Sequence, residues 1–213
     1  MRETLKEKKK RTAEIVRLLK EEYPKSQCTL DYTDPLQLLV ATQLAAQCTD
    51  ARVNLTTPAL FEEYPDVYAF ANADELRLRE LIRSTGFYKN KAKNIISCCK
   101  KIVSDFGGEV PKTMEELLTL AGVGRKTANL VLGDIFGIPG IVVDTHATRL
   151  SNRMGLTKNK DPKKIEDDLL KLVEKEEQTD FCHRLVDHGR ACCTARTPKC
   201  GECVLFGVCP KII

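Results

Sequence analysis

The segment of residues 120–129, which reads Leu-Ala-Gly-Val-Gly-Arg-Lys-Thr-Ala-Asn, has the residue types and spacing most suited to chemistry. Gly122 and Gly124 permit a tight turn with positive φ, and the helix predicted to follow presents unpaired N–H groups and a positive dipole end. Such a hairpin binds phosphate groups. Lys126 places a primary amine, a potential nucleophile, in the first turn of that helix. The simpler alternative is a glycine-bounded helix start with a solvated lysine.

A second chemical motif is a group of four cysteines near the C-terminus: Cys193, Cys200, Cys203 and Cys209. Their spacing, C-x6-C-x2-C-x5-C, lets short loops bring four thiolates to one inorganic centre. Zinc sites usually contain two C-x-x-C pairs, and only one is present here, so the spacing favours a 4Fe-4S cluster over zinc. Cys192 is easily mistaken for the first ligand. Arg196 and Lys199 lie between the first two ligands, on a loop that can hold a phosphate.

Composition limits the class of protein. The 213 residues are enough for one large domain or two lobes, and we expect two. The net charge of +4 fits a polyanionic partner if the positive charge is clustered. The first eleven residues are highly charged, no targeting signal follows, and no apolar run is long enough to span a bilayer, so we expect a soluble cytoplasmic protein. In a reducing compartment, a tight group of cysteines indicates a metal centre or cluster. The remaining cysteines are predicted to be small buried or half-buried residues: Cys28, Cys48, Cys98, Cys99 and Cys182.

Apolar residues at helical spacing predict an all-α fold that positions these motifs. The expected helices cover 11–23, 36–46, a segment from 50, 67–70, 74–82, 92–103, 114–120, a segment from the glycines to 135, a segment after Asp144, 162–173 and a segment from 180 towards 189. Residues 138–143 form the only strand-like piece. Lys126 falls off the apolar stripe of its helix, so it faces a cleft or solvent. Lys89, Lys91 and Lys93 are predicted to lie on a solvated face, where some contact the phosphates of a polyanionic partner.

The sequence resembles the endonuclease III family of DNA glycosylases and abasic-site lyases, which belongs to the helix-hairpin-helix superfamily. The resemblance runs from about Asp34 through Cys209. It is carried by Leu-Ala-Ala-Gln-Cys-Thr-Asp at 44–50, the hairpin at 122–129, Val-Asp-Thr-His at 143–146, His-Gly-Arg at 188–190 and the four-cysteine tail. Two residues depart from the family's usual pattern. Ala121 replaces a proline and loosens the chain entering the turn, and Phe87 replaces a leucine with a larger ring.

The resemblance implies a role for each of these residues. Lys126 and Asp144 are the catalytic pair, and the four cysteines of the tail hold a 4Fe-4S cluster. Gln47 fills the space that an extruded base leaves, with Phe87 as the wedge beside it. Asp50 and His146 line the substrate pocket, although a structural histidine is an alternative for His146. The full set of expected DNA-binding residues is Gln47, Phe87, Gly122, Gly124, Arg125, Thr127, Arg149, Arg196 and Lys199.

The resemblance also implies an all-α fold of two lobes. The first is a helical barrel over 30–137 that contains the helix-hairpin-helix at about 112–132. The second is a cluster domain formed by 1–29 with 138–213, and DNA lies in the cleft between the lobes. The expected activity is removal of oxidised or damaged pyrimidines from duplex DNA, followed by strand cleavage 3′ to the abasic site, by a monomer that binds no membrane.

Alternatives remain open at this point. A related glycosylase for mismatched thymine or pyrimidine dimers would keep the lysine, whereas an adenine glycosylase lacks it. A non-catalytic iron–sulfur DNA-binding redox sensor is an alternative of a different class.

Overall fold

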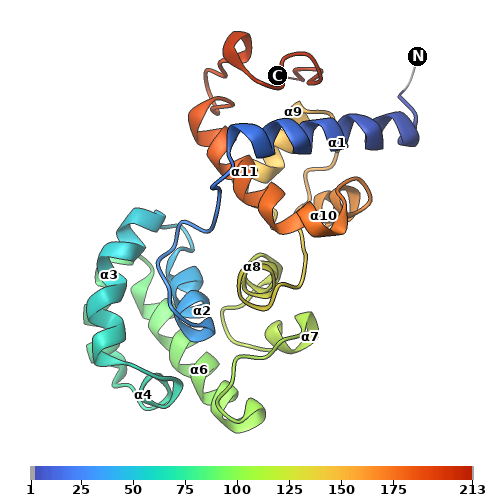
Figure 1. Cartoon of the computed structure of the whole chain (residues 1–213). Helices are drawn as coiled ribbons and strands as arrows, with labels where there is room; N and C mark the ends of the chain where they lie inside the picture. The colour runs from blue at the N-terminus through green and yellow to red at the C-terminus, as the bar shows by residue number, and fades with distance from the viewer. Residues whose placement is uncertain (1–2, 213) are drawn as a thin grey trace. The chain divides into compact units, whose positions relative to one another are not determined.

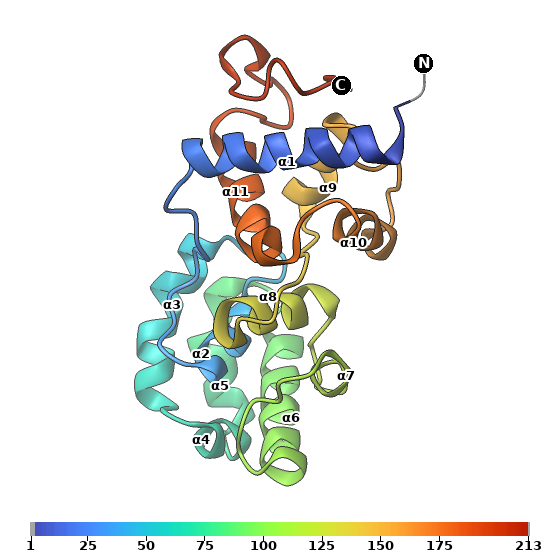
Figure 2. The ribbon, with the colours of Figure 1, turned by 45° about the vertical axis from the view of Figure 1, so that its right-hand side comes forward.

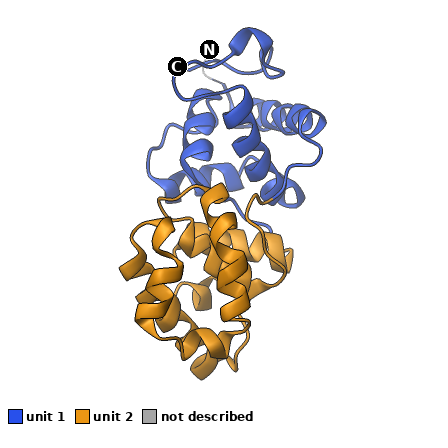
Figure 3. Cartoon of the chain, turned by 90° about the vertical axis from the view of Figure 1, so that its left-hand side faces the viewer, with its two compact units in different colours: residues 1–27, 138–213 blue, residues 28–137 orange. Residues whose placement is uncertain are grey.

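Residues 3–212 of the computed structural model are described, and they contain helices and loops but no β-strand. The prediction of an all-α fold is confirmed. Residues 138–143, expected to be extended, belong to a loop without ladder hydrogen bonds. The chain divides into two compact units, residues 28–137 and residues 1–27 with 138–213 (Figure 3). Among residues 3–212, no helix combines the length and apolar character needed to cross a membrane.

The unit of residues 28–137 is built around two helices that contact each other, α2 (Pro35–Leu44) and α6 (Tyr88–Phe106). Its elements are α2 (Pro35–Leu44), α3 (Asp50–Glu63), α4 (Val67–Ala71), α5 (Glu75–Leu81), the 3₁₀ turn η1 (Arg83–Thr85), α6 (Tyr88–Phe106), α7 (Met114–Leu117) and α8 (Arg125–Phe136). α2 contacts α3, α6 and α8, and α6 also packs against α4 and α5 (Figures 1 and 2). Every residue of α2 from Leu38 to Leu44 is buried, as its apolar sequence predicts. α2 is therefore the buried helix against which α3, α6 and α8 pack.

The unit of residues 1–27 and 138–213 contains α1 (Leu5–Glu22), α9 (Thr145–Arg153), α10 (Pro162–Leu170), η2 (Lys175–Glu177), α11 (Gln178–Ala191) and η3 (Cys200–Glu202). α11 packs against α1 and α9, and α10 packs against α9. α1 begins six residues before the predicted start at Arg11. The reason is a capping box, in which Thr4 and Glu7 satisfy each other's backbone N–H groups.

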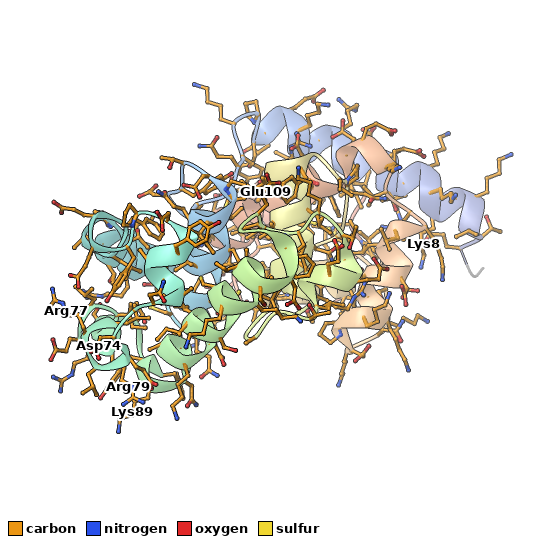
Figure 4. All side chains as sticks on the ribbon, turned by 90° about the horizontal axis from the view of Figure 1, so that it is seen from below. Lys8, Asp74, Arg77, Arg79, Lys89 and Glu109 are labelled. Atoms are coloured by element: carbon orange, nitrogen blue, oxygen red, sulfur yellow. The ribbon has the colours of Figure 1, made fainter. Side chains whose placement is uncertain are left out.

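Most charged side chains lie on the surface (Figure 4). Asp74 caps α5, and Arg77 pairs with Glu63 at 2.6 Å between Nη2 and Oε2. Lys89 is exposed, as predicted for this helix face. Lys91 differs: only 6% of its surface is exposed, so the prediction of a solvated side chain was wrong for this residue.

Candidate active site and metal centre

Gly122 makes the sharp turn between α7 and α8. Its φ of +76° lies in the left-handed region that favours glycine. A Cβ at this position would lie 2.7 Å from Gln43 Oε1, too close for a contact, and 3.0 Å from Asn94 Cβ, closer than most Cβ contacts. Gln43 is buried, so its side chain would have to shift within the packed interior to make room. The turn therefore requires glycine for two independent reasons, its φ and its close packing.

Gly124 serves a different purpose from Gly122. Its φ is −104°, so the positive φ that the Gly-Val-Gly segment permits occurs at Gly122 and not at Gly124. Gly124 is the N-cap of α8, no side chain caps the helix, and a Cβ added to Gly124 would meet nothing within 4 Å. Open space therefore lies before the uncapped first turn of a twelve-residue helix. This arrangement is suited to an approaching phosphate group.

Lys126 is exposed in the first turn of α8, which confirms the prediction that it faces away from the core. Ala128 and Val131, on the apolar stripe of the same helix, are fully buried. Arg125 is half-buried, and only 9% of Thr127 is exposed, so a ligand at this end reaches Thr127 mainly through its backbone N–H. The helix start thus offers one accessible amine next to backbone donors.

Asp144 is the N-cap of α9, where its Oδ1 accepts a hydrogen bond from the Ala147 N–H at 2.7 Å. Its Oδ2 accepts no hydrogen bond from residues 3–212. One carboxylate can therefore cap the helix through one oxygen and interact with a substrate through the other. Lys126 belongs to the unit of residues 28–137 and Asp144 to the other unit.

Gln47 and Phe87 share an unusual backbone conformation. Their φ values are +55° and +48°, in a region where non-glycine residues are uncommon. Each such residue costs about 1–2 kcal/mol relative to a relaxed conformation, and strain of this kind clusters at functional sites. Both side chains are exposed, Phe87 by 62%. The structure therefore presents a polar and an aromatic side chain on two strained turns of the same unit.

Arg149 and His146 lie on α9 and pack against the C-terminal end of α11. Arg149 Nη2 lies 3.1 Å from the Cys193 carbonyl oxygen and 3.2 Å from both the Gly189 carbonyl oxygen and His146 Nδ1. A Cβ at Gly189 would collide with His146, so this close packing requires glycine. These contacts give Arg149 a structural role, and its binding to DNA stays a prediction.

Asp50 is the first residue of α3 and accepts a hydrogen bond from Thr29 Oγ1 at 2.5 Å. Its predicted place in a substrate pocket stays a prediction.

The four tail cysteines predicted as cluster ligands line one small cavity. All are half-buried and none forms a disulfide. Burial raises the pKa of Cys203 to about 11, so its thiol keeps its proton unless a metal replaces it. Arg153 secures the first ligand, because its Nη1 lies 2.6 Å from the Thr194 carbonyl oxygen and 3.5 Å from Cys193 Sγ. Arg153, Lys199 and Lys211 also line the cavity, so four thiols face a positively charged space. This lining fits an iron–sulfur cluster, whose ligands lie further apart than those of a single metal ion.

His188, the first residue of the His-Gly-Arg segment, also lines this cavity. It is 1% exposed, its Nε2 lies 3.5 Å from Cys203 Sγ, and Tyr23 Oη lies 3.1 Å from its Nδ1. Among the described residues, His188, Cys192 and Cys203 are the only group close enough to hold a single metal ion. The sequence does not predict this contact, because His188 and Cys203 are fifteen residues apart and only the fold brings them together.

The hairpin with an amine at its helix start and the four-cysteine cavity together define a helix-hairpin-helix protein with an iron–sulfur centre. Residues 40–175 match the HhH-GPD superfamily of base excision DNA repair proteins, and residues 193–209 match the iron–sulfur binding domain of endonuclease III. The chain therefore belongs to the HhH-GPD superfamily of base excision DNA repair proteins, within the endonuclease III family. The prediction of a base excision repair enzyme with a 4Fe-4S cluster is confirmed.

Relatives match this chain over nearly its whole length. It is 58% identical to endonuclease III of Synechocystis sp. over 205 residues, covering 96% of this chain and 94% of the relative. It is 39% identical to endonuclease III of Escherichia coli K12 over 201 residues, covering 94% and 95%.

Solved structures give the same result. A non-covalent endonuclease III–DNA complex matches with a TM-score of 0.91 and 39% identity, covering 95% of each chain. A trapped endonuclease III–DNA covalent intermediate matches with a TM-score of 0.91 and 39% identity, covering 95% of this chain and 96% of the other. A thermostable thymine-DNA glycosylase, at 22% identity and a TM-score of 0.87, shares the fold.

Proposed function

We propose that this protein is a bifunctional DNA glycosylase and abasic-site lyase that removes oxidised or ring-damaged pyrimidines from duplex DNA. The observation that carries the proposal is the exposed Lys126 amine beside the uncapped start of α8. The relative whose covalent intermediate with DNA was trapped supports it. We further propose that the protein acts as a monomer in the cytoplasm, associated with the nucleoid.

Binding to the DNA backbone is assigned to the hairpin and the cluster loop. The N–H groups at the start of α8 receive a phosphate in the open space at Gly124, with Arg125 and Thr127 contributing from the first turn. The exposed side chains of Arg196 and Lys199 bind a second phosphate. Such contacts set the position and affinity of the protein without reading sequence.

Access to the reacting sugar requires that the damaged nucleotide rotate out of the stack, which costs about a few kcal/mol and least for damaged bases. Gln47 occupies the vacated position and Phe87 wedges beside it, so their contacts offset part of that cost. Asp50 and His146 contact the extruded base. These four assignments follow the family resemblance and agree with the exposure of Gln47 and Phe87.

The reaction begins when the neutral Lys126 amine forms a bond from Nζ to C1′ of the sugar. The bond between C1′ and the base breaks, and the base leaves with the electron pair and takes up a proton. Asp144 accepts the proton that the attacking amine loses and stabilises the developing positive charge. The nitrogen lone pair then expels O4′ from C1′, and O4′ takes up a proton as the sugar ring opens. The iminium that results acidifies the C2′ proton. Its removal breaks the C3′–O bond and cleaves the strand by β-elimination.

The cluster is assigned to the cysteines of the tail, Cys193, Cys200, Cys203 and Cys209. With a cluster held by these four cysteines, the loop of Arg196 and Lys199 would be fixed in shape, since both residues lie between the first two ligands. Arg149 and Arg153 of α9 join this loop to the helix that Asp144 caps. The residues that hold the cluster thereby also position the catalytic carboxylate.

A panel of duplexes, each with one defined lesion, tests the proposal. We expect base release and strand cleavage at oxidised pyrimidines and abasic sites, and loss of both in Lys126→Gln. Faster release of mismatched thymine or of pyrimidine dimers would assign the protein to a related glycosylase. DNA binding without any cleavage would favour a non-catalytic redox sensor.

A further inference from the structure

Lys91 of α6 is a buried lysine that touches two turns of the unit of residues 28–137. Its Nζ donates hydrogen bonds to the carbonyl oxygens of Leu44, at 2.7 Å, and Thr85, at 2.8 Å. Leu44 ends α2, and Thr85 ends η1. The two acceptors are 41 positions apart in the sequence, so the lysine joins segments that are connected only through the fold.

Each of these carbonyl groups lies just before one of the two strained residues. Gln47 follows Leu44 by three positions, and Phe87 follows Thr85 by two. Gln47 and Phe87 both have positive φ, a conformation that persists only where the surroundings hold it. The Lys91 ammonium group therefore binds the backbone just before the turn of Gln47 and just before the turn of Phe87.

The electrostatics argue against a purely structural reading of Lys91. Burial lowers its pKa, and no carboxylate among residues 3–212 forms an ion pair with it. A buried ammonium without a counter-ion is usually less favourable than an apolar side chain. Two charge-assisted bonds to backbone oxygens compensate for this cost and fix the distance between the two turns.

We propose that Lys91 is a positioning residue for base extrusion, which holds the turns of Gln47 and Phe87 at the spacing needed to enter the DNA stack together. This inference rests on the proposed function, because it takes Gln47 and Phe87 as the residues that enter the duplex. Lys91 acts through the two turns and does not itself contact the reacting atoms.

The test compares Lys91→Met with wild type on one abasic site placed in duplex and in single-stranded DNA. Single-stranded DNA has no paired stack to open, so the spacing of the turns matters only in the duplex. We expect strand cleavage of the duplex to slow by about 10- to 100-fold, the range for a small misplacement of a functional group. Cleavage of the single strand should stay within about twofold of wild type, which also shows that the variant is folded.

Matched variants keep the test specific. Lys100→Met removes an exposed lysine from the same helix and should leave both rates unchanged. Lys91→Gln keeps amide donors for one of the two carbonyls and should give an intermediate duplex rate. In the background of Gln47→Ala with Phe87→Ala, Lys91→Met should have little further effect, because the residues that it positions are gone.

The outcomes separate the two proposals. If Lys91→Met slows duplex and single-strand cleavage equally, or if its effect adds fully to that of the double variant, the positioning role is overturned. If wild type cleaves neither substrate, the proposed lyase activity itself is wrong.

Discussion

Replacing Gly122 by alanine should lower stability, whereas replacing Gly124 should weaken DNA binding, although the two glycines are separated by one residue. At Gly122, alanine must adopt a φ of +76°, which costs about 1–2 kcal/mol. Its Cβ also lies 2.7 Å from buried Gln43 Oε1, and overpacking of this kind costs about 1–3 kcal/mol. We therefore expect Gly122→Ala to lose about 2–5 kcal/mol of unfolding free energy.

At Gly124, alanine meets neither obstacle, because φ is −104° and no atom lies within 4 Å of the new Cβ. Alanine restricts the unfolded chain but is a poorer N-cap than glycine, so these two effects largely cancel. Unfolding free energy should change by less than about 1 kcal/mol. The added methyl group instead occupies the space where a phosphate approaches, so DNA affinity should fall by about tenfold, which corresponds to about 1.4 kcal/mol.

The assay is thermal unfolding of both variants at equal iron content, together with DNA binding at one stated salt concentration. Gly122→Ala should lower Tm by about 4–20 °C, since about 1 kcal/mol corresponds to about 2–4 °C in a chain of this size. Equal loss of stability in the two variants would refute the account of the turn. Unchanged DNA affinity in Gly124→Ala would refute the account of the phosphate site.

Three further predictions concern other residues. Asp144→Asn should keep the cap of α9 and leave Tm unchanged, because asparagine caps helices well, while base release slows by about 10²–10⁴-fold. A nearly normal rate of base release would show that the carboxylate takes no part in the reaction. Arg153→Met leaves the Thr194 and Ala195 carbonyls without their donor, so the iron and sulfide content per chain should fall by about half or more. An unchanged iron content would show that Arg153 does not secure the loop. Phe87→Gly relieves a φ of +48°, so it should raise the free energy of unfolding by up to about 1 kcal/mol while it slows cleavage of the duplex. A lower free energy of unfolding in this variant would contradict the assignment of strain to Phe87.

The helices and the cysteine centre could be predicted because their signals are local. Asp34-Pro35 marks the start of α2, and spacing within seventeen residues brings the four tail cysteines together. The start of α1 also had a local signal, the pair of Thr4 and Glu7, which the surrounding charged residues obscured.

Other features depend on contacts that sequence spacing does not encode. A Gly-Val-Gly segment is compatible with positive φ at either glycine, and the packing of Gln43 and Asn94 requires it only at Gly122. A lysine in an amphipathic helix predicts a solvated side chain, yet Lys91 is buried because its acceptors come from α2 and η1. The contact of His188 with Cys203 likewise exists only in the folded chain.

The central claim is that the Lys126 amine forms the covalent bond to the sugar. The most direct measurement is reduction with borohydride during reaction with abasic-site duplex, followed by peptide mass spectrometry of the trapped protein. The account predicts that the reduced sugar adduct is on Lys126 and that Lys126→Gln forms no adduct. An adduct on Lys91, on another lysine or on the N-terminal amine, formed equally well in Lys126→Gln, would contradict it.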